Sequence, residues 1–165
     1  MDDTQTRETR AGQTREEHEH EDEHSLEGLD PRFFAHAQMP CNLGKPDHWD
    51  GRALGVGVCG DSIEVFIDVN GSTLKQVRHT PRGCVYTVAC GSAVSKLAEG
   101  RLVEEVLKIQ PQDVADELGG LPADHMHCAN LAVNTLGEAV ADYYRKVWGR
   151  PGKGGGPEKP PGRKK

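Results

Sequence analysis

The chain has 165 residues and a net charge of −6, and this length favours one folded domain. The charge is uneven, because residues 1–30 carry −8 and residues 149–165 carry +5, and the mildly acidic middle argues against nucleic acid as a partner. No stretch approaches the ~18 apolar residues that span a bilayer, and the N-terminus has neither a secretory nor an organelle-targeting pattern, so we expect a cytoplasmic protein without a membrane segment.

The first segment, residues 1–28, is dense in Glu, Asp, Thr and Arg and has almost no large apolar side chains. Such a composition cannot bury enough apolar surface to offset the entropy of ordering the chain, so we expect a disordered acidic tail. His18, His20 and His24 alternate with acidic residues in this tail. A tract of this kind can bind transition metals weakly, but a solvated tail is the favoured interpretation.

A folded domain is expected from residue 29 to residue 148. It starts with a helix at 31–38, because Asp followed by Pro is a helix-start signal, and a loop continues to residue 52. A weak strand with glycine interruptions is predicted at 53–58, and a strong one with period-two apolar residues at 62–69. Asn70-Gly71 predicts a hairpin turn into another strand at 73–80.

The second half of the chain is predicted to be helical. Apolar residues recur at three- and four-residue steps from Cys84 until Gly100. Helices follow at 102–107, at 111–118 and from near Cys128 to before Gly149. Two or three antiparallel strands followed by helices predict an α+β domain with the helices packed on one face of the sheet. Residues 149–165 are mostly Gly, Pro, Lys and Arg and are expected to form a disordered basic tail.

Three cysteines lie in polar, glycine-rich settings beside other metal-binding side chains. Cys59 has Asp61 two positions further on. Cys84 follows a glycine at a predicted helix start, where the helix dipole favours thiolate, and Cys128 follows His127 at another helix start. Thiolate, imidazole and carboxylate are ligands of zinc and of iron–sulfur clusters. Five cysteines in a reducing compartment also favour metal-binding or catalytic thiols over disulfides.

Each of these residues also has a purely structural interpretation. Cys59 can lie incidentally in a turn that is capped by Asp61, and Cys84 can be a packed residue at a helix start. His127 can be a surface or capping histidine. The sequence by itself leaves these alternatives open.

The other metal-capable residues of the domain are expected to have no ligand role. Cys90 lies about 240° around the helix from Cys84, so it should pack in the core. Cys41 follows a proline in a loop and is expected to be a free thiol. His125 is another candidate ligand beside His127, but it is expected to be an ordinary histidine.

Several stretches of the sequence closely resemble the NifU/IscU-type iron–sulfur cluster assembly scaffolds. The resemblance covers about residues 30–148, and the cysteine spacings are also similar to those of that family. Single motifs are weak signals, but the ordered set is specific. The stretches are Met39-Pro40-Cys41-Asn42-Leu43-Gly44, Val58-Cys59-Gly60-Asp61, Gly83-Cys84, Ala115-Asp116-Glu117-Leu118-Gly119-Gly120-Leu121-Pro122 and His127-Cys128.

The resemblance implies a three-stranded antiparallel sheet with helices on one side and the cysteines at one exposed end. It implies a scaffold, not an enzyme, that assembles a transient [2Fe–2S] cluster on Cys59, Cys84 and Cys128 and delivers it to acceptor apo-proteins. Asp61 or His127 would supply the fourth ligand or control release. A cysteine desulfurase would donate sulfur, with Cys128 as the persulfide acceptor. The site should also bind Zn²⁺, and we expect a monomer or weak homodimer.

The sequence departs from the family where Ala123-Asp124-His125 stands. Many members have a proline, valine and lysine there that a dedicated Hsp70-type chaperone grips, so this departure argues against chaperone-assisted release. Two competing hypotheses remain. One is a zinc-bound sulfurtransferase that accepts persulfide, which is disfavoured because the chain lacks the insertion typical of that branch. The other is a structural zinc module, which should unfold without metal.

Overall fold

The computed structural model describes residues 26–149, and the predicted tails lie outside the described residues except for Leu26–Gly28 and Gly149. The boundary between tail and domain therefore stays a prediction. The helices and strands follow in the order α2 (Pro31–Gln38), β1 (Gly51–Val56), β2 (Ser62–Asn70), β3 (Thr73–Arg82), α3 (Val85–Ala98), α4 (Val103–Val106), α5 (Pro111–Glu117), η1 (Ala123–His125, a 3₁₀ turn) and α6 (Met126–Trp148).

The three strands form one antiparallel sheet in the order β1-β2-β3, and the predicted α+β class is confirmed. The β2–β3 hairpin turns at Asn70-Gly71, as predicted, with Gly71 at φ 65°, a conformation that glycine adopts without steric cost. The expected α2 is also present, and the Asp30 side chain caps it by accepting a hydrogen bond from the Arg32 backbone at 2.8 Å.

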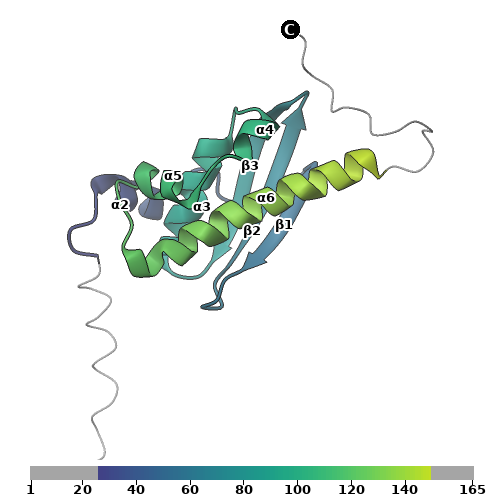
Figure 1. Ribbon diagram of the computed structural model, residues 1–165. Helices are drawn as coiled ribbons and strands as arrows, with labels where there is room; N and C mark the ends of the chain where they lie inside the picture. Colours follow the sequence, from purple (N-terminus) through teal and green to yellow (C-terminus); the bar gives the residue numbers. More distant parts are fainter. Residues whose placement is uncertain (1–25, 150–165) are drawn as a thin grey trace, which may run out of the picture.

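The helices cover one face of the sheet (Figure 1). Helix α6 crosses β1 and β2, while α3 packs against β3. The period-two residues Ile63, Val65 and Ile67 of β2 are buried under them. Because this face is mostly apolar and covered, the register of the hairpin is strongly specified.

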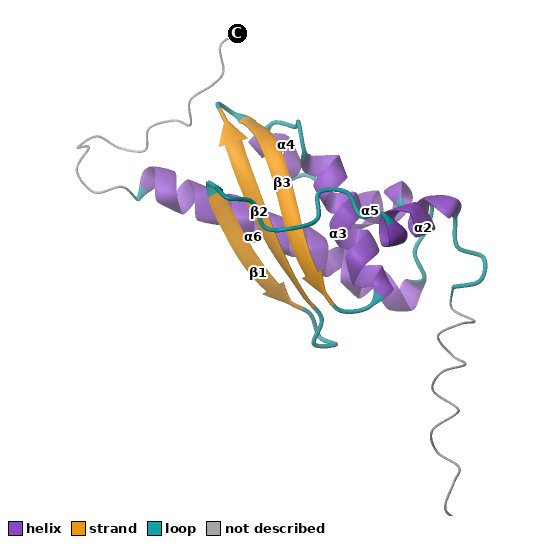
Figure 2. Cartoon of the chain, turned by 180° about the vertical axis from the view of Figure 1, so that it is seen from behind, coloured by secondary structure: helices purple, strands orange, loops and turns teal. Residues whose placement is uncertain are grey.

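The opposite face is crossed by the loop between α2 and β1 (Figure 2). Phe66, which points away from the helices, is buried there with its ring 5.2 Å from that of Trp49. Leu43 in the same loop forms a parallel bridge with His79 of β3. The loop therefore acts as a partial second layer.

Strand β1 occupies residues 51–56, whereas the glycine-interrupted pattern predicted residues 53–58. Gly51 and Gly55 are part of the packing against α6. An added Cβ at Gly55 would overlap the Thr135 hydroxyl, and one at Gly51 would overlap the Ala139 carbonyl. These glycines let the helix approach the strand closely, so they do not end the strand.

Helix α3 is buried on most of its surface, and Cys90 lies fully inside the core, as predicted. Cys41 is a free, half-buried thiol in the loop, also as predicted. Helix α6 begins two residues earlier than the predicted start near Cys128, because the 3₁₀ turn η1 runs directly into it. Among residues 26–149, no helix has both the length and the apolar composition needed to cross a bilayer.

Candidate metal centre

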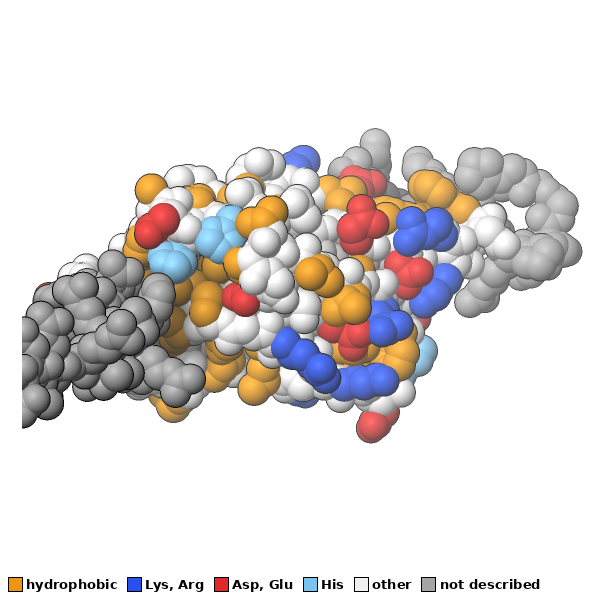
Figure 3. Space-filling view, turned by 90° about the horizontal axis from the view of Figure 1, so that it is seen from below, with side chains coloured by type: hydrophobic (Ala, Val, Ile, Leu, Met, Phe, Trp, Pro, Cys, Tyr) orange, Lys and Arg blue, Asp and Glu red, His pale blue; other side chains and the backbone are white. Residues whose placement is uncertain are grey.

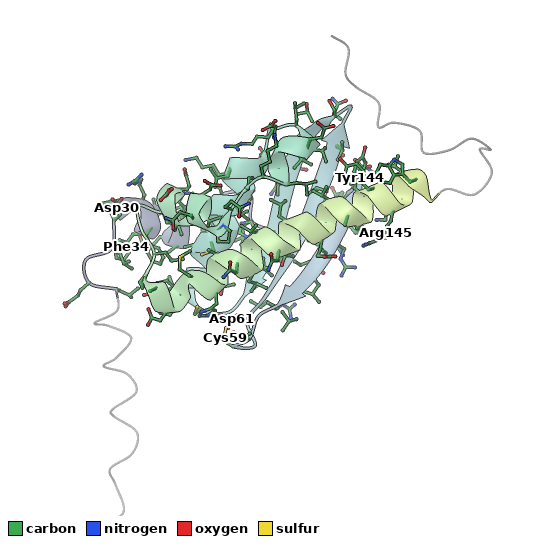
Figure 4. The ribbon with its side chains drawn as sticks, viewed as in Figure 1. Asp30, Phe34, Cys59, Asp61, Tyr144 and Arg145 are labelled. Atoms are coloured by element: carbon green, nitrogen blue, oxygen red, sulfur yellow. The ribbon has the colours of Figure 1, made fainter. Side chains whose placement is uncertain are left out.

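The candidate ligands come from three separate parts of the fold. Cys59 and Asp61 lie in the turn between β1 and β2, where Figure 4 shows them together. Cys84 is the N-cap residue of α3, and Cys128 is in the first turn of α6. The fold thereby brings Cys59, Cys84 and Cys128 to one end of the sheet, although they are separated by 25 and then 44 positions in the sequence.

Asp61 links the turn to α3. Its Oδ2 accepts hydrogen bonds from the Cys84 backbone N–H at 3.0 Å and from the Thr87 hydroxyl at 2.8 Å. These donors, the Cys84 amide first, hold the pKa of the Asp61 carboxyl below its usual value of 3.8. The thiols of Cys84 and Cys59 lie near enough to lower it further. Asp61 is therefore an ionised carboxylate at neutral pH, placed among the thiols.

Thr87 is a site residue that the sequence analysis missed. Its hydroxyl oxygen lies 3.7 Å from Cys84 Sγ and 3.6 Å from Cys128 Sγ, in addition to its hydrogen bond to Asp61. Thr87 follows Cys84 by three positions, a spacing that places both side chains on one face of a helix. This spacing was the one sequence signal for Thr87 as a site residue, but a threonine three positions after a cysteine is not a distinctive motif.

Cys128 differs from the other candidate thiols because it is buried, whereas Cys59 and Cys84 are exposed. Burial, with a smaller contribution from the neighbouring charges of Cys84 and Cys59, raises the pKa of Cys128 to about 11. Cys84 Sγ and Cys128 Sγ both lie within 3.7 Å of the Thr87 hydroxyl oxygen, and the Thr87 hydroxyl donates to Asp61, which lies two positions from Cys59 in the turn. The three thiols therefore lie in one neighbourhood.

His127 lies beside the same thiols, because one of its ring nitrogens is close to Cys128 Sγ. The two residues and His125 each offer one ligand atom, and these three atoms all lie within 4.8 Å of one another. His127 and His125 are both half-buried. The structure thus brings all five predicted site residues to one end of the domain, and it adds Thr87 and His125, which the sequence analysis did not select.

A first prediction concerns Thr87. Thr87→Val keeps the buried volume but removes the donor to the Asp61 carboxylate, so we expect a loss of about 1 kcal/mol in the free energy of unfolding at pH 7. The lowered pKa of Asp61 sets the sign of the pH dependence. The contribution is present above the usual Asp value of 3.8 and disappears as the pH falls through the lower folded-state pKa.

Urea unfolding of both proteins at pH 7 and in acid measures this difference. Thr87→Ser is the matched control, since it keeps the hydroxyl and should keep the pH dependence of the wild-type chain. A Thr87→Val penalty that is the same at both pH values would show that the hydroxyl does not act through the carboxylate.

Comparison with known proteins identifies the family of the chain. The sequence model of the NifU-like N terminal domain matches residues 30–149. The chain is 40% identical over 116 residues to "Iron-sulfur cluster assembly scaffold protein IscU 1" of Archaeoglobus fulgidus, covering 70% of this chain and 76% of that protein. It is 32% identical over 118 residues to "Iron-sulfur cluster assembly scaffold protein IscU" of Aquifex aeolicus, covering 70% and 75%.

Solved structures show the same fold. A nitrogen-fixing NifU-like protein (N-terminal) from Brucella abortus superimposes with a TM-score of 0.58 at 15% identity, covering 71% of this chain and 94% of the other. A putative SUF-system scaffold protein from Fervidobacterium islandicum gives a TM-score of 0.57 at 14% identity, covering 67% and 95%. The matched family model spans nearly all of the described residues, and the chain therefore belongs to the NifU-like N-terminal domain family.

Proposed function

We propose that this protein is a scaffold on which a [2Fe–2S] cluster is assembled from iron and sulfur and from which the cluster passes to acceptor apo-proteins. The observation that supports the proposal is the convergence of Cys59, Cys84 and Cys128 around Asp61 and Thr87. Thiolates are the usual protein ligands of iron–sulfur clusters. The names of the relatives favour this role over that of a sulfurtransferase.

The exposure of the site suits a carrier. Cys59 and Cys84 are exposed, and Asp61 sits beside them as a carboxylate. Three thiolates with one harder ligand, either Asp61 or His127, hold a cluster less tightly than four thiolates do, which favours release. The same sulfur, nitrogen and oxygen donors suit Zn²⁺, so we propose that the isolated protein also binds zinc.

We propose that a cysteine desulfurase supplies the sulfur and that Cys128 accepts it. In this step the Cys128 thiolate attacks the outer sulfur of the donor persulfide, a new S–S bond forms on Cys128, and the donor cysteine leaves as a thiolate. Because Cys128 is buried with a raised pKa, the step requires the site to open and the thiol to lose its proton. We propose that release does not depend on a dedicated Hsp70-type chaperone.

The test is anaerobic incubation of the full chain with ferrous iron, cysteine, a cysteine desulfurase and a dithiol reductant, which supplies the electrons that reduce persulfide sulfur to sulfide. We expect a visible iron–sulfur absorption with two iron atoms per cluster, and transfer of the cluster to an apo-protein that lacks one. Cys59→Ser, Cys84→Ser and Cys128→Ser should each remove the absorption, because each removes a thiolate ligand.

The chain provides its own controls. Cys41→Ser and Cys90→Ala change a loop cysteine and a core cysteine that are not among the proposed ligands, and both variants should assemble the cluster. If the three site variants assemble the cluster as well as these controls do, the proposed function is wrong. Asp61→Ala and His127→Ala, compared in the same assay, identify the fourth ligand by the shorter lifetime of the cluster.

A further inference from the structure

Among the described residues, two groups of side chains have ligand atoms close enough to share a metal ion: His48, Asp50 and Asp68, and His125, His127 and Cys128. The first group is largely satisfied by its own contacts. His48 lies 3.4 Å from an Asp50 carboxylate oxygen, and Asp50 also accepts a hydrogen bond from a backbone N–H at 2.8 Å. The second group is different, because one of its members has an unsatisfied polar atom.

The His125 ring is held in place from one side. It stacks on Tyr86 with ring centroids 3.6 Å apart and an interplanar angle of 9°. Its Nδ1 atom is buried and has no hydrogen-bond partner. An unsatisfied buried polar atom costs about 1–3 kcal/mol, and a metal ion bound to it would remove this cost.

The neighbours of His125 supply the rest of a coordination set. Its ring centroid lies 5.9 Å from that of His127, and one ligand atom from each histidine lies within 4.8 Å of Cys128 Sγ. Figure 3 shows histidine side chains close together on the face of the molecule seen from below, with hydrophobic side chains beside them. Two imidazoles and one thiolate are donors that suit Zn²⁺ and Fe²⁺ and leave a coordination position open.

We propose that His125, His127 and Cys128 form a binding site for one divalent transition-metal ion, and that this is where Fe²⁺ first binds before cluster assembly. The proposal deepens the proposed function and rests on it, because Cys128 belongs to both ligand sets. Cys59, Asp61 and Cys84 then remain available for the second iron, and Cys128 leaves the first iron when its thiolate accepts the incoming sulfur. Figure 4 shows the turn that carries two of these residues.

The test uses Co²⁺ as a spectroscopic probe, titrated anaerobically into the full chain. The background variant carries His18→Asn, His20→Asn and His24→Asn, which removes the other histidine tract. It also carries His48→Ala, which disables the first group, His48, Asp50 and Asp68. Adding Cys59→Ser, Asp61→Asn and Cys84→Ser leaves His125, His127 and Cys128 as the one candidate group among residues 26–149. We expect this protein to bind one Co²⁺ with a d–d spectrum typical of a four-coordinate ion and a charge-transfer band from one thiolate.

His125→Phe in that protein is the decisive variant. Phenylalanine keeps a ring that can stack on Tyr86 but has no nitrogen, so Co²⁺ should bind at least about 10-fold more weakly. Circular dichroism and the urea midpoint, measured without metal, report whether the fold is kept. His125→Asn provides a second variant if the larger ring disturbs packing. Co²⁺ binding of undiminished affinity in a folded His125 variant would overturn the proposal.

The two proposals fail separately. In the otherwise unmodified chain, His125→Phe should raise the Fe²⁺ concentration needed for half-maximal cluster assembly. If the unmodified chain forms no cluster at all, the proposed scaffold function is wrong, whereas one-thiolate Co²⁺ binding would still establish the metal site.

Discussion

Gly83→Ala should slow cluster assembly by about 10-fold or more although every proposed ligand is unchanged. A Cβ at position 83 would overlap the carboxyl group of Asp61. The carboxylate would have to leave the Cys84 amide and the Thr87 hydroxyl, and it would carry the turn with Cys59 away with it. Ligand sets must be held to within about 0.5 Å, so this displacement should disable the site.

Gly137→Ala is the matched control for this prediction. An added Cβ at Gly137 meets no atom within 4 Å, and the residue lies inside α6. Alanine there should raise the free energy of unfolding by about 1 kcal/mol and leave assembly unchanged. The measurement is the initial rate of absorption increase in the desulfurase assay. Equal rates for Gly83→Ala and Gly137→Ala would show that the position of Asp61 does not control assembly.

At pH 7, Cys59 and Cys84 should be alkylated more than 100-fold faster than Cys128 and Cys90. Cys59 and Cys84 are exposed, whereas Cys128 and Cys90 are buried. The pKa of Cys128, raised to about 11, leaves roughly one molecule in 10⁴ as thiolate at pH 7, against a few per cent for an ordinary cysteine of pKa about 8.5. Burial lowers its access as well, so it should react far more slowly.

Raising the pH from 7 to 9 should increase the Cys128 rate about 100-fold, since the thiolate fraction grows tenfold per pH unit below the pKa. Iodoacetamide labelling followed by peptide mass spectrometry measures each site. Cys90 is the internal control, because burial raises its pKa even further and it should stay unlabelled until the domain unfolds. Labelling of Cys128 at the rate of Cys84 at pH 7 would show that Cys128 is open in solution.

Local patterns were sufficient to predict much of the sheet and the helices. The β2–β3 hairpin follows from a period-two apolar strand and an Asn-Gly turn, and both are present in the structure. The start of α3 at Cys84 follows from the glycine that precedes it. The predicted limits of β1 were wrong by two residues. Gly51 and Gly55 belong to the strand because they allow α6 to pack closely against it, and this contact involves residues about 80 positions away in the sequence.

The added site residues could not be selected from sequence, for different physical reasons. Thr87 acts through its distance to Asp61, and only the fold determines which side of α3 faces the β1–β2 turn. His125 was expected to be ordinary because its stacking on Tyr86 and its unsatisfied nitrogen are properties of packing. Phe66 lies off the period-two face of β2, and only the fold shows that the loop carrying Trp49 buries it on the opposite face.

The position of α6 at the end of the described chain has a consequence for biosynthesis. Cys59 and Cys84 leave the ribosome tens of residues before Cys128, which lies in the first turn of the 23-residue helix α6. Until Cys128 has been synthesised, Cys59 and Cys84 lack the third proposed thiolate ligand. A nascent chain can therefore form the three-thiol arrangement only after the start of α6 has been synthesised.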